Sequence, residues 1–365
     1  MNEQYLHFIW NNKRLPFHNI KTANNESVEF IHVGNYNEFQ SGPDFSMAKV
    51  RIDGLVWVGS IELHVNSSDW YRHKHHLDKA YNNVILHVVY IHDKDVEING
   101  RKLPVVELKP HIEFDHFLKY SKLQNNIKKH FPCQSLFNQK YLIELESMKI
   151  QCVQNRLDKK TKLKNTIRSE SDDFIFLSFI ASAFGSSVNS QPFEELINSF
   201  SIDEIKNFEE ENLAEVLSRF FWRRKGLFSN PEKRLRQFIA FLNDYDFEVQ
   251  FWEFPTSMIP LYIEQQFKKA SLKSSFLLNN FIINCVVRFI YWKGKKLNNP
   301  IFIKKALRLL EITPKESNHL TKKWGVMGVQ PKNGFESQAL LEIYEQFCSK
   351  KACLDCAIGK KILTV

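Results

Sequence analysis

Hydrophobic and polar residues follow a strand-like pattern in the first third of the chain and a helical pattern after it. Short β-branched and aromatic segments predict strands at 27–33, 44–52, 56–66, 84–91 and 105–108. The segment 84–91, VILHVVYI, is almost wholly apolar, which is typical of a strand buried on both faces. Helices are predicted over 5–12 and from 69 to about 80. The predicted order is helix, three strands, helix, strand.

Alternation within segment 44–52 predicts which side chains share a face. Phe45, Met47 and Lys49 would lie on one face, with Ala48 and Val50 on the other. A turn at Asp53-Gly54 then predicts a hairpin that leads into segment 56–66.

From about residue 114 onward, apolar residues recur at helical spacing. Helices are predicted at 141–156, 172–184, 192–199, 203–219, 231–245, 260–270, 277–293, 301–310 and 336–348. We therefore predict an α+β chain with two domains. The first is a mixed core over 1–115, and the second is an all-helical domain over 116–365.

Composition places the chain among ordinary globular proteins and argues against a membrane protein. It has 365 residues, of which 43% are hydrophobic and 25% charged. The longest nearly uncharged stretch, 174–184, is far shorter than the roughly 20 residues that span a bilayer. The start, Met1 to Gln4, is acidic, whereas a signal peptide begins with basic residues. We expect a cytoplasmic protein with no membrane partner.

The net charge of +9 is unevenly distributed. Residues 1–130 carry 16 basic and 15 acidic side chains, so the surplus lies downstream. One basic stretch, RFFWRRK, interleaves cations with aromatic rings and contains Arg223, Arg224 and Lys225. Such residues contact phosphates and stack on bases, so we predict nucleic-acid binding here. A solvated face of a core helix gives the same pattern.

The segment that carries candidate chemistry lies in the predicted hairpin. Side chains two apart on a strand share a face, so Glu62 and His64 point the same way. The turn at Asp53-Gly54 brings Asp44 toward them. Two carboxylates form a hard-oxygen site for Mg²⁺ or Mn²⁺. Such an ion lowers the pKa of bound water and neutralises charge on a phosphodiester.

This arrangement resembles the PD-(D/E)xK nuclease superfamily, and it also looks like a widespread bacterial family of unknown function. The signature comprises GPDF, IELH, SSDW and VILHVVY. The resemblance implies a restriction-endonuclease-like αβββαβ core in which Asp44 and Glu62 bind the metal. His64 stands where the superfamily has lysine, and would orient or deprotonate water. The resemblance also implies an alternative, because the superfamily tolerates a basic residue that has moved to the next helix; here that residue would be Lys74 or Lys79.

Two alternative placements of the chemistry stay open. In one, Asp93 or Asp95 is the first acid and Glu107-Leu108-Lys109 is a literal acid-x-Lys. In the other, histidines form a transition-metal site with Asp69 and Asp78. Six histidines crowd this region, at His64, His73, His75, His76, His87 and His92. HKHH is typical of an exposed turn and His87 of a core strand, so His73 is the histidine we expect to face Glu62.

Cysteines form a second candidate site. Cys152 and Cys285 lie within apolar helical patterns and are expected to be inert. Cys348, Cys353 and Cys356 fall within nine residues, and Cys133 supplies a fourth thiol. Some PD-(D/E)xK nucleases similarly use one distant and three C-terminal cysteines around an iron–sulfur cluster, although with another spacing. We therefore predict a [4Fe–4S] cluster or Zn²⁺ at these four cysteines.

Three functional hypotheses follow. The first is a metal-dependent nuclease that hydrolyses phosphodiester bonds, on DNA in preference to RNA. The second is an inactive nuclease-like protein that binds nucleic acid or acts as a scaffold, which the missing lysine at position 64 supports. The third is a metal hydrolase of another substrate class that uses the histidines.

Overall fold

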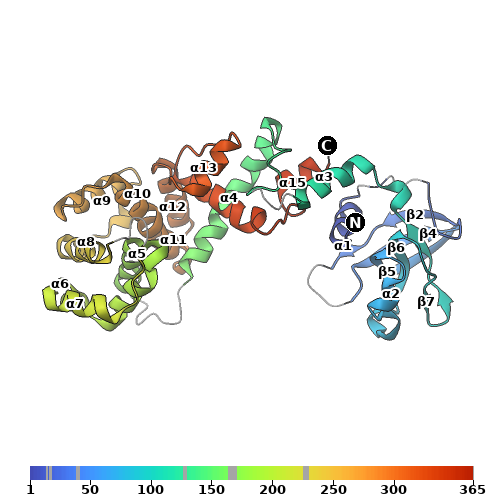
Figure 1. Cartoon of the computed structure of the whole chain (residues 1–365), viewed down its shortest axis with the longest axis horizontal. Coiled ribbons are helices and arrows are strands. Elements are labelled where there is room, and N and C mark those ends of the chain that lie inside the picture. The colour runs from blue at the N-terminus through green and yellow to red at the C-terminus, as the bar shows by residue number, and fades with distance from the viewer. Residues whose placement is uncertain are drawn as a thin grey trace. The chain divides into compact units, whose positions relative to one another are not determined.

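The computed structural model divides the chain into two compact units (Figure 1). It describes residues 1–364 except 14, 16–18, 38–41, 126–129, 163–170 and 225–229. The first unit comprises Met1–Tyr141 and Phe347–Val365, and the second comprises Leu142–Gln346. The first unit thus extends past the predicted boundary at 115 and includes the C-terminal segment. Lys225 lies outside the described residues.

A mixed sheet forms the centre of the first unit. Its strands are β1 (Ile20–Lys21), β2 (Ser27–His32), β3 (Asn35–Tyr36), β4 (Phe45–Ile52), β5 (Leu55–Asn66), β6 (Val84–Ile91) and β9 (Val105–Glu107). The order is β1-β2-β4-β5-β6-β9, with β3 paired to β4. The pairs from β1 to β5 are antiparallel, whereas β5–β6 and β6–β9 are parallel. The five predicted strands are confirmed, each within one residue of its predicted ends.

The turn at Asn99-Gly100 closes a hairpin of its own, made of β7 (Glu97–Ile98) and β8 (Arg101–Lys102). β9 then returns to the main sheet beside β6. β6 is buried along Val84–Val89, as its apolar sequence predicts.

The alternation predicted for β4 is wrong at its start. The register against β5 shifts between Phe45 and Ala48, where Met47 adopts a φ of 56° and is 69% exposed. Such a bulge adds one residue to one strand and moves the preceding side chain to the other face. Phe45 is therefore buried together with Ala48 and Val50.

The helix predicted over 69–80 is also wrong. The connection from β5 to β6 contains only a short helix, α2 (Asp69–Arg72), and two 3₁₀ turns, η1 (His75–Leu77) and η2 (Lys79–Tyr81). Lys74 has a φ of 63°, which lies in the left-handed region. A right-handed helix cannot continue through a residue with that backbone angle. The reversal at Lys74 directs His75 toward the sheet.

Helices and the C-terminal segment complete the first unit. They include α1 (Glu3–Asn11), α3 (Phe114–Asn125) and α15 (Ala357–Ile362), with 3₁₀ turns η3 (Lys109–His111) and η4 (Gln139–Tyr141). Trp10 of α1 is fully buried and its indole N–H donates to Val33 O at 3.1 Å. Tyr5 stacks on Tyr120 of α3 with ring centroids 4.4 Å apart. These contacts hold α1 against the segment after β2 and against α3.

The second unit is helical. Its elements are α4 (Leu142–Thr161), α5 (Asp172–Ser199), α6 (Ile202–Lys206), α7 (Glu210–Arg219), α8 (Pro231–Asp244), η6 (Phe251–Glu253), α9 (Met258–Lys269), α10 (Ser275–Phe281), η7 (Ile282–Val286), α11 (Val287–Lys296), α12 (Pro300–Ile312), α13 (His319–Val326), α14 (Gly334–Ile343) and η8 (Tyr344–Cys348). Phenylalanine dominates the core, where the Phe184 ring packs against the rings of Phe238 and Phe241. The chain is thus mixed α and β, with an N-terminal sheet and a helical C-terminal region.

One stretch of the second unit, Ser275–Lys296, is long and apolar enough to cross a membrane by length and composition. However, 61% of its apolar window is buried inside the unit, as in a core helix of a globular protein, so the indication is weak.

Candidate functional site

Asp44 and Glu62 meet at the start of β4 and the middle of β5. The Asp44 amide donates to Glu62 Oε2 at 3.0 Å, and the Leu63 amide donates to Asp44 Oδ2 at 2.9 Å. The Glu62 carboxylate is thus bonded to the backbone of Asp44, and the Asp44 carboxylate is bonded to the backbone of β5 next to Glu62. Glu62 is 4% exposed, whereas the Asp44 side chain is 20% exposed. The structure places the two predicted carboxylates together.

A cluster of imidazoles surrounds Glu62. His64 lies on the same face of β5, with its Nε2 3.6 Å from Glu62 Oε1. The Nε2 of His75 approaches the same oxygen at 3.2 Å. His64 also contacts His73, with Nε2 and Nδ1 3.1 Å apart, and its Nδ1 lies 2.8 Å from His87 Nε2. One nitrogen from each of His64, His73 and His75 lies within 4.8 Å of the others.

Burial shifts the pKa values of these groups. Glu62 has its pKa raised to about 9 by burial and then by the negative charge of Asp44. His64 has its pKa lowered to about 2 by burial and then by the neighbouring imidazoles. For His87, burial lowers the pKa to about 3. Near neutral pH, His64 and His87 are therefore neutral imidazoles, and the Glu62 carboxyl group retains a proton unless a cation replaces it.

His7 joins the site from α1. Its Nε2 lies 3.1 Å from Asp44 Oδ2, and its Nδ1 lies 3.3 Å from the Tyr36 hydroxyl. Burial lowers the pKa of His7, but the hydrogen bond and charge of Asp44 outweigh it, so the net pKa is raised. Sequence reasoning missed His7, although its place one turn after Glu3 on an amphipathic helix is a weak signal. It also missed His75, because HKHH is typical of an exposed turn.

The donor set fits a divalent metal ion. His75 Nε2 is buried and makes no hydrogen bond among the described residues, although Glu62 Oε1 lies 3.2 Å away. Neutral imidazoles and carboxylates are ligands for Mn²⁺ and Zn²⁺, whereas Mg²⁺ prefers oxygen alone. The residues present could therefore hold Mn²⁺ or Zn²⁺ on nitrogen and oxygen, or Mg²⁺ on Asp44 and Glu62.

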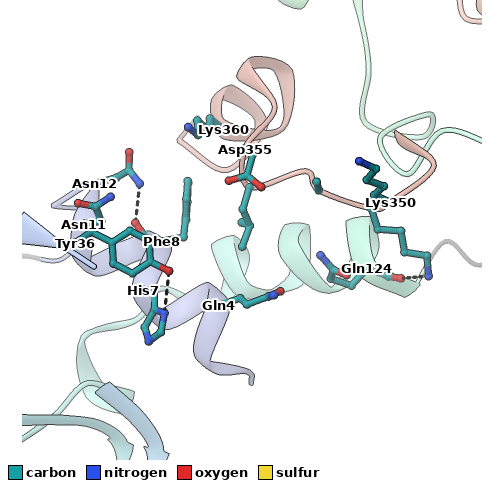
Figure 2. Close-up of a pocket in the computed structure, with 13 residues that line it drawn as sticks. Gln4, His7, Phe8, Asn11, Asn12, Tyr36, Gln124, Lys350, Asp355 and Lys360 are labelled. Atoms are coloured by element: carbon teal, nitrogen blue, oxygen red, sulfur yellow. Dashed lines mark hydrogen bonds between the residues drawn. The ribbon is translucent and has the colours of Figure 1, made fainter. Parts of the chain in front are cut away.

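A cleft of about 440 Å³ opens beside His7 (Figure 2). Its walls come from α1, α3 and the C-terminal segment. Figure 2 shows His7 and Tyr36 on one side, with Lys350, Asp355 and Lys360 on the segment that faces them. The full lining is Gln4, His7, Phe8, Asn11, Asn12, Tyr36, Gln124, Lys350, Lys351, Ala352, Leu354, Asp355 and Lys360. Three lysines against one aspartate make this cleft a basic surface.

All four cysteines of the second candidate site lie in the first unit. Cys133, Cys348, Cys353 and Cys356 are buried and form no disulfide. Burial raises the pKa of Cys348, and the charges of Cys133, Cys356 and Cys353 raise it further. The four thiols are therefore electrostatic neighbours. The amides of Gly359 and Ile358 donate to Cys356 and counteract the burial effect on its pKa.

Tetrahedral zinc and a [4Fe–4S] cluster both take four cysteine thiolates as ligands. A separate group of three metal-ligating side chains, His64, His73 and His75, has its ligand atoms within 4.8 Å of one another. Cys152 and Cys285 are buried in α4 and η7, as predicted for core residues.

Arg223 and Arg224 lie in the second unit after α7, and both are exposed. The side chain of Asn189 accepts from the Arg223 amide at 2.8 Å and donates to Arg223 O at 3.1 Å. This backbone clamp fixes the start of the basic segment.

The acids of the first alternative placement, Asp93 and Asp95, make structural contacts. Asp93 accepts hydrogen bonds from the Ser67 and Ser68 hydroxyls, which lower the Asp93 pKa. Asp95 pairs with Lys102 at 2.9 Å. Lys74 and Lys79 are both exposed. The side chain that approaches Glu62 from the β5–β6 connection is therefore His75, not a lysine.

Comparison with known proteins gives one match. Residues 3–258 match the model of a family described as a protein of unknown function (DUF2851). The comparisons with curated proteins and with solved structures gave no match. The matched residues cover the carboxylate–histidine site, including His7 and His87.

Proposed function

We propose that this chain, which belongs to the DUF2851 family, is a divalent-metal-dependent nuclease that hydrolyses phosphodiester bonds in nucleic acid. The single observation that carries the proposal is the convergence of Asp44, Glu62 and neutral imidazoles beside a lysine-lined cleft. A carboxylate–imidazole set attracts a cation, and the lysines attract a polyanion. The succession of α1, β2, β4, β5, α2 and β6 supports the resemblance to the PD-(D/E)xK core.

Asp44 and Glu62 would hold the ion, with His64, His73 and His75 as nitrogen ligands. A bound ion lowers the pKa of water and offsets negative charge on the phosphate. His64 is a metal ligand and not a base in this account, because its Nδ1 faces His87 and its Nε2 faces His73, a second proposed ligand. This revises the sequence-based role of His64 as the group that deprotonates water.

His7 is the better candidate for proton transfer. It lines the cleft, and the hydrogen bond and charge of Asp44 outweigh burial and raise its pKa, which favours the protonated imidazole. A protonated imidazole at this position could deliver its proton to the leaving oxygen of the cleaved phosphodiester. Lys350 and Lys360 on the opposite wall would hold the adjoining phosphates.

The four cysteines are proposed to bind a metal centre that fixes the C-terminal lysines beside α1. Their burial and their electrostatic proximity support a centre, which is a [4Fe–4S] cluster or Zn²⁺. In either case the centre is structural. It would join the segment of Cys133 to the one that carries Lys350 and Lys360.

Incubation with nucleic acid tests the proposal. Single- and double-stranded DNA and RNA are each incubated with the protein in Mg²⁺, Mn²⁺, Zn²⁺ or EDTA. We expect cleavage that requires the metal, with DNA as the preferred substrate. Glu62→Gln should reduce the rate at least 100-fold, whereas Asp115→Asn, an exposed acid of α3, serves as the matched control. Equal cleavage by both variants would reject the proposal.

The second candidate, an inactive nucleic-acid-binding protein, is favoured by one observation: no lysine approaches Glu62 among the described residues. This candidate predicts binding that weakens steeply with salt and no metal-dependent cleavage.

A further inference from the structure

The second unit encloses a cavity of about 590 Å³ between α4, α5, α10 and α11. Four of its lining residues are cationic: Arg156, Lys160, Arg234 and Arg288. Two are acidic, Glu316 and Glu345. Leu277, Leu320 and Leu341 supply apolar walls. The volume falls within the range of small-molecule sites, roughly 300 to 1,000 Å³.

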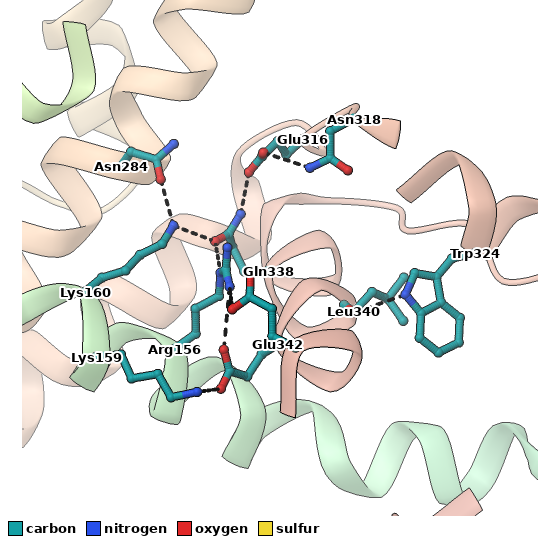
Figure 3. Close-up of polar contacts among 11 residues, drawn as sticks. Arg156, Lys159, Lys160, Asn284, Glu316, Asn318, Trp324, Gln338, Leu340 and Glu342 are labelled. Atoms are coloured by element: carbon teal, nitrogen blue, oxygen red, sulfur yellow. Dashed lines mark hydrogen bonds and ion pairs between the residues drawn. The ribbon is translucent and has the colours of Figure 1, made fainter. Parts of the chain in front are cut away.

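Two of the cations have only neutral partners. Lys160 Nζ donates to Asn284 Oδ1 at 2.8 Å and to Gln338 Oε1 at 3.1 Å (Figure 3). The Arg288 guanidinium donates to Lys160 O at 3.1 Å and to Ser182 Oγ at 3.3 Å. Within the described residues, neither cation forms an ion pair with a carboxylate. Burial, Arg156 and Arg288 lower the pKa of Lys160 to about 7, while Glu316 and Glu345 oppose them.

The two acids already have partners other than Lys160 and Arg288. Glu316 accepts from Gln338 Nε2 at 2.6 Å and from Asn318 Nδ2 at 3.0 Å. Glu345 pairs with Arg156 at 2.9 Å. Figure 3 shows Gln338 between Lys160 and Glu316, so an amide separates the two charges. The cavity therefore retains positive charge that protein carboxylates do not neutralise.

The break in α5 adds hydroxyl groups to the same cavity. Ser182, Ser186 and Ser190 line it at intervals of four residues. Ser186 has φ 52° and ψ −163°, a region that glycine alone adopts without strain. Strain of this kind costs about 1 to 3 kcal/mol and persists where the surrounding structure requires it. Here it brings serines from both halves of α5 to one cavity.

We propose that this cavity binds a phosphate monoester of nucleotide size. Lys160 and Arg288 would hold the phosphate, and the serines would donate to its oxygens. Phe276 also lines the cavity and is 42% exposed, so its ring is available to stack on a base. The phosphate could belong to a free nucleotide or to the 5′ end of a strand. The proposal is independent of the proposed nuclease activity.

Calorimetric titration of the full-length protein tests it. The probes are adenosine monophosphate, adenosine, and one oligonucleotide with either a 5′-phosphate or a 5′-hydroxyl. We expect adenosine monophosphate to bind and adenosine to bind at least ten-fold more weakly. Preference for the 5′-phosphorylated oligonucleotide over the mononucleotide would identify a strand end as the ligand. Equal binding of adenosine and its monophosphate, or no binding of any phosphate, would overturn the proposal.

Lys160→Met separates a binding role from a structural one. Methionine matches the lysine stem and removes a buried charge, so the ligand-free variant should melt at the same or a higher temperature. Its affinity for adenosine monophosphate should fall at least ten-fold. Lys269→Met, on an exposed lysine of α9, is the matched control and should bind as the unmodified protein does. Unchanged affinity in Lys160→Met would refute the assignment.

Discussion

The backbone amide of Asp44 donates a 3.0 Å hydrogen bond to the carboxylate of Glu62, and Asp44 in turn accepts from the amide next to Glu62. Hydrogen bonds to the two strands thus fix both acids. Because an amide side chain keeps an oxygen that accepts such a bond, Asp44→Asn and Glu62→Gln should preserve the fold. These variants therefore remove charge without removing the geometry.

Metal affinity should depend on Glu62 and on His75. We expect Glu62→Gln and His75→Ala each to weaken Mn²⁺ binding at least ten-fold, because each removes one ligand from a site with few others. Calorimetric titration of the metal-free protein measures the effect. Asp115→Asn should leave Mn²⁺ affinity unchanged. If Glu62→Gln binds Mn²⁺ as tightly as the unmodified protein, the ion is held elsewhere.

Gly359 should tolerate no side chain. A Cβ atom there would lie 2.1 Å from Cys353 O, so the segment between the last two cysteines would have to move. We expect Gly359→Ala to destabilise the protein by about 1 to 3 kcal/mol and to lower its metal content. In Gly325, by contrast, a Cβ meets nothing closer than 3.8 Å, so Gly325→Ala is the control. Urea denaturation measures both, and equal stabilities would disprove the close approach.

The four-cysteine site should bind metal as a unit. Cys133→Ser and Cys356→Ser are each expected to abolish the bound iron or zinc, because three thiols leave the centre incomplete. Elemental analysis and visible absorption of anaerobically purified protein distinguish an iron–sulfur cluster from zinc. Cys152→Ser, a buried cysteine of α4, should retain the full metal content. Metal retained in Cys133→Ser would show that the distant cysteine is not a ligand.

Lys160 should make stability depend on pH. Its pKa is about 7 when folded and 10.5 in its ordinary state, so the unfolded chain binds more protons between these values. The contribution of Lys160 to the free energy of unfolding therefore rises with pH between 7 and 10.5. It is lowest below pH 7. Relative to Lys160→Met, the unmodified protein should gain on the order of 1 kcal/mol from pH 7 to 10. A parallel dependence in both proteins would contradict the shift.

The local sequence pattern was enough to predict the strands and the proximity of Asp44 to Glu62. The alternation of side chains predicts the strands, and the hairpin turn brings the two acids together. The same reasoning failed at Met47, where one extra residue reverses the faces, and at Lys74, where a left-handed residue ends a helix. Neither residue is glycine, so the sequence carries no local signal for these conformations. For this reason the sequence did not predict that His75 approaches Glu62, since that approach depends on the chain reversal at Lys74.

His7 was hidden for a different reason. Its contact with Asp44 spans 37 residues and depends on how α1 packs on the sheet, which no local pattern specifies. Cys133 lies even further in sequence from the three C-terminal cysteines. The chain has only six cysteines, however, so the four candidate ligands could be proposed from the sequence. The neutral amides around Lys160 could not be predicted, since they come from η7 and α14 on separate segments.

The most direct test compares cleavage of single-stranded DNA by the unmodified protein and by Asp44→Asn at saturating Mn²⁺. Both proteins, with Asp115→Asn as the control for co-purified nucleases, are prepared identically. We predict a rate at least 100-fold lower for Asp44→Asn and an unchanged rate for Asp115→Asn. Equal rates for all three proteins, or no Mn²⁺-dependent cleavage of DNA or RNA by any of them, would contradict the account.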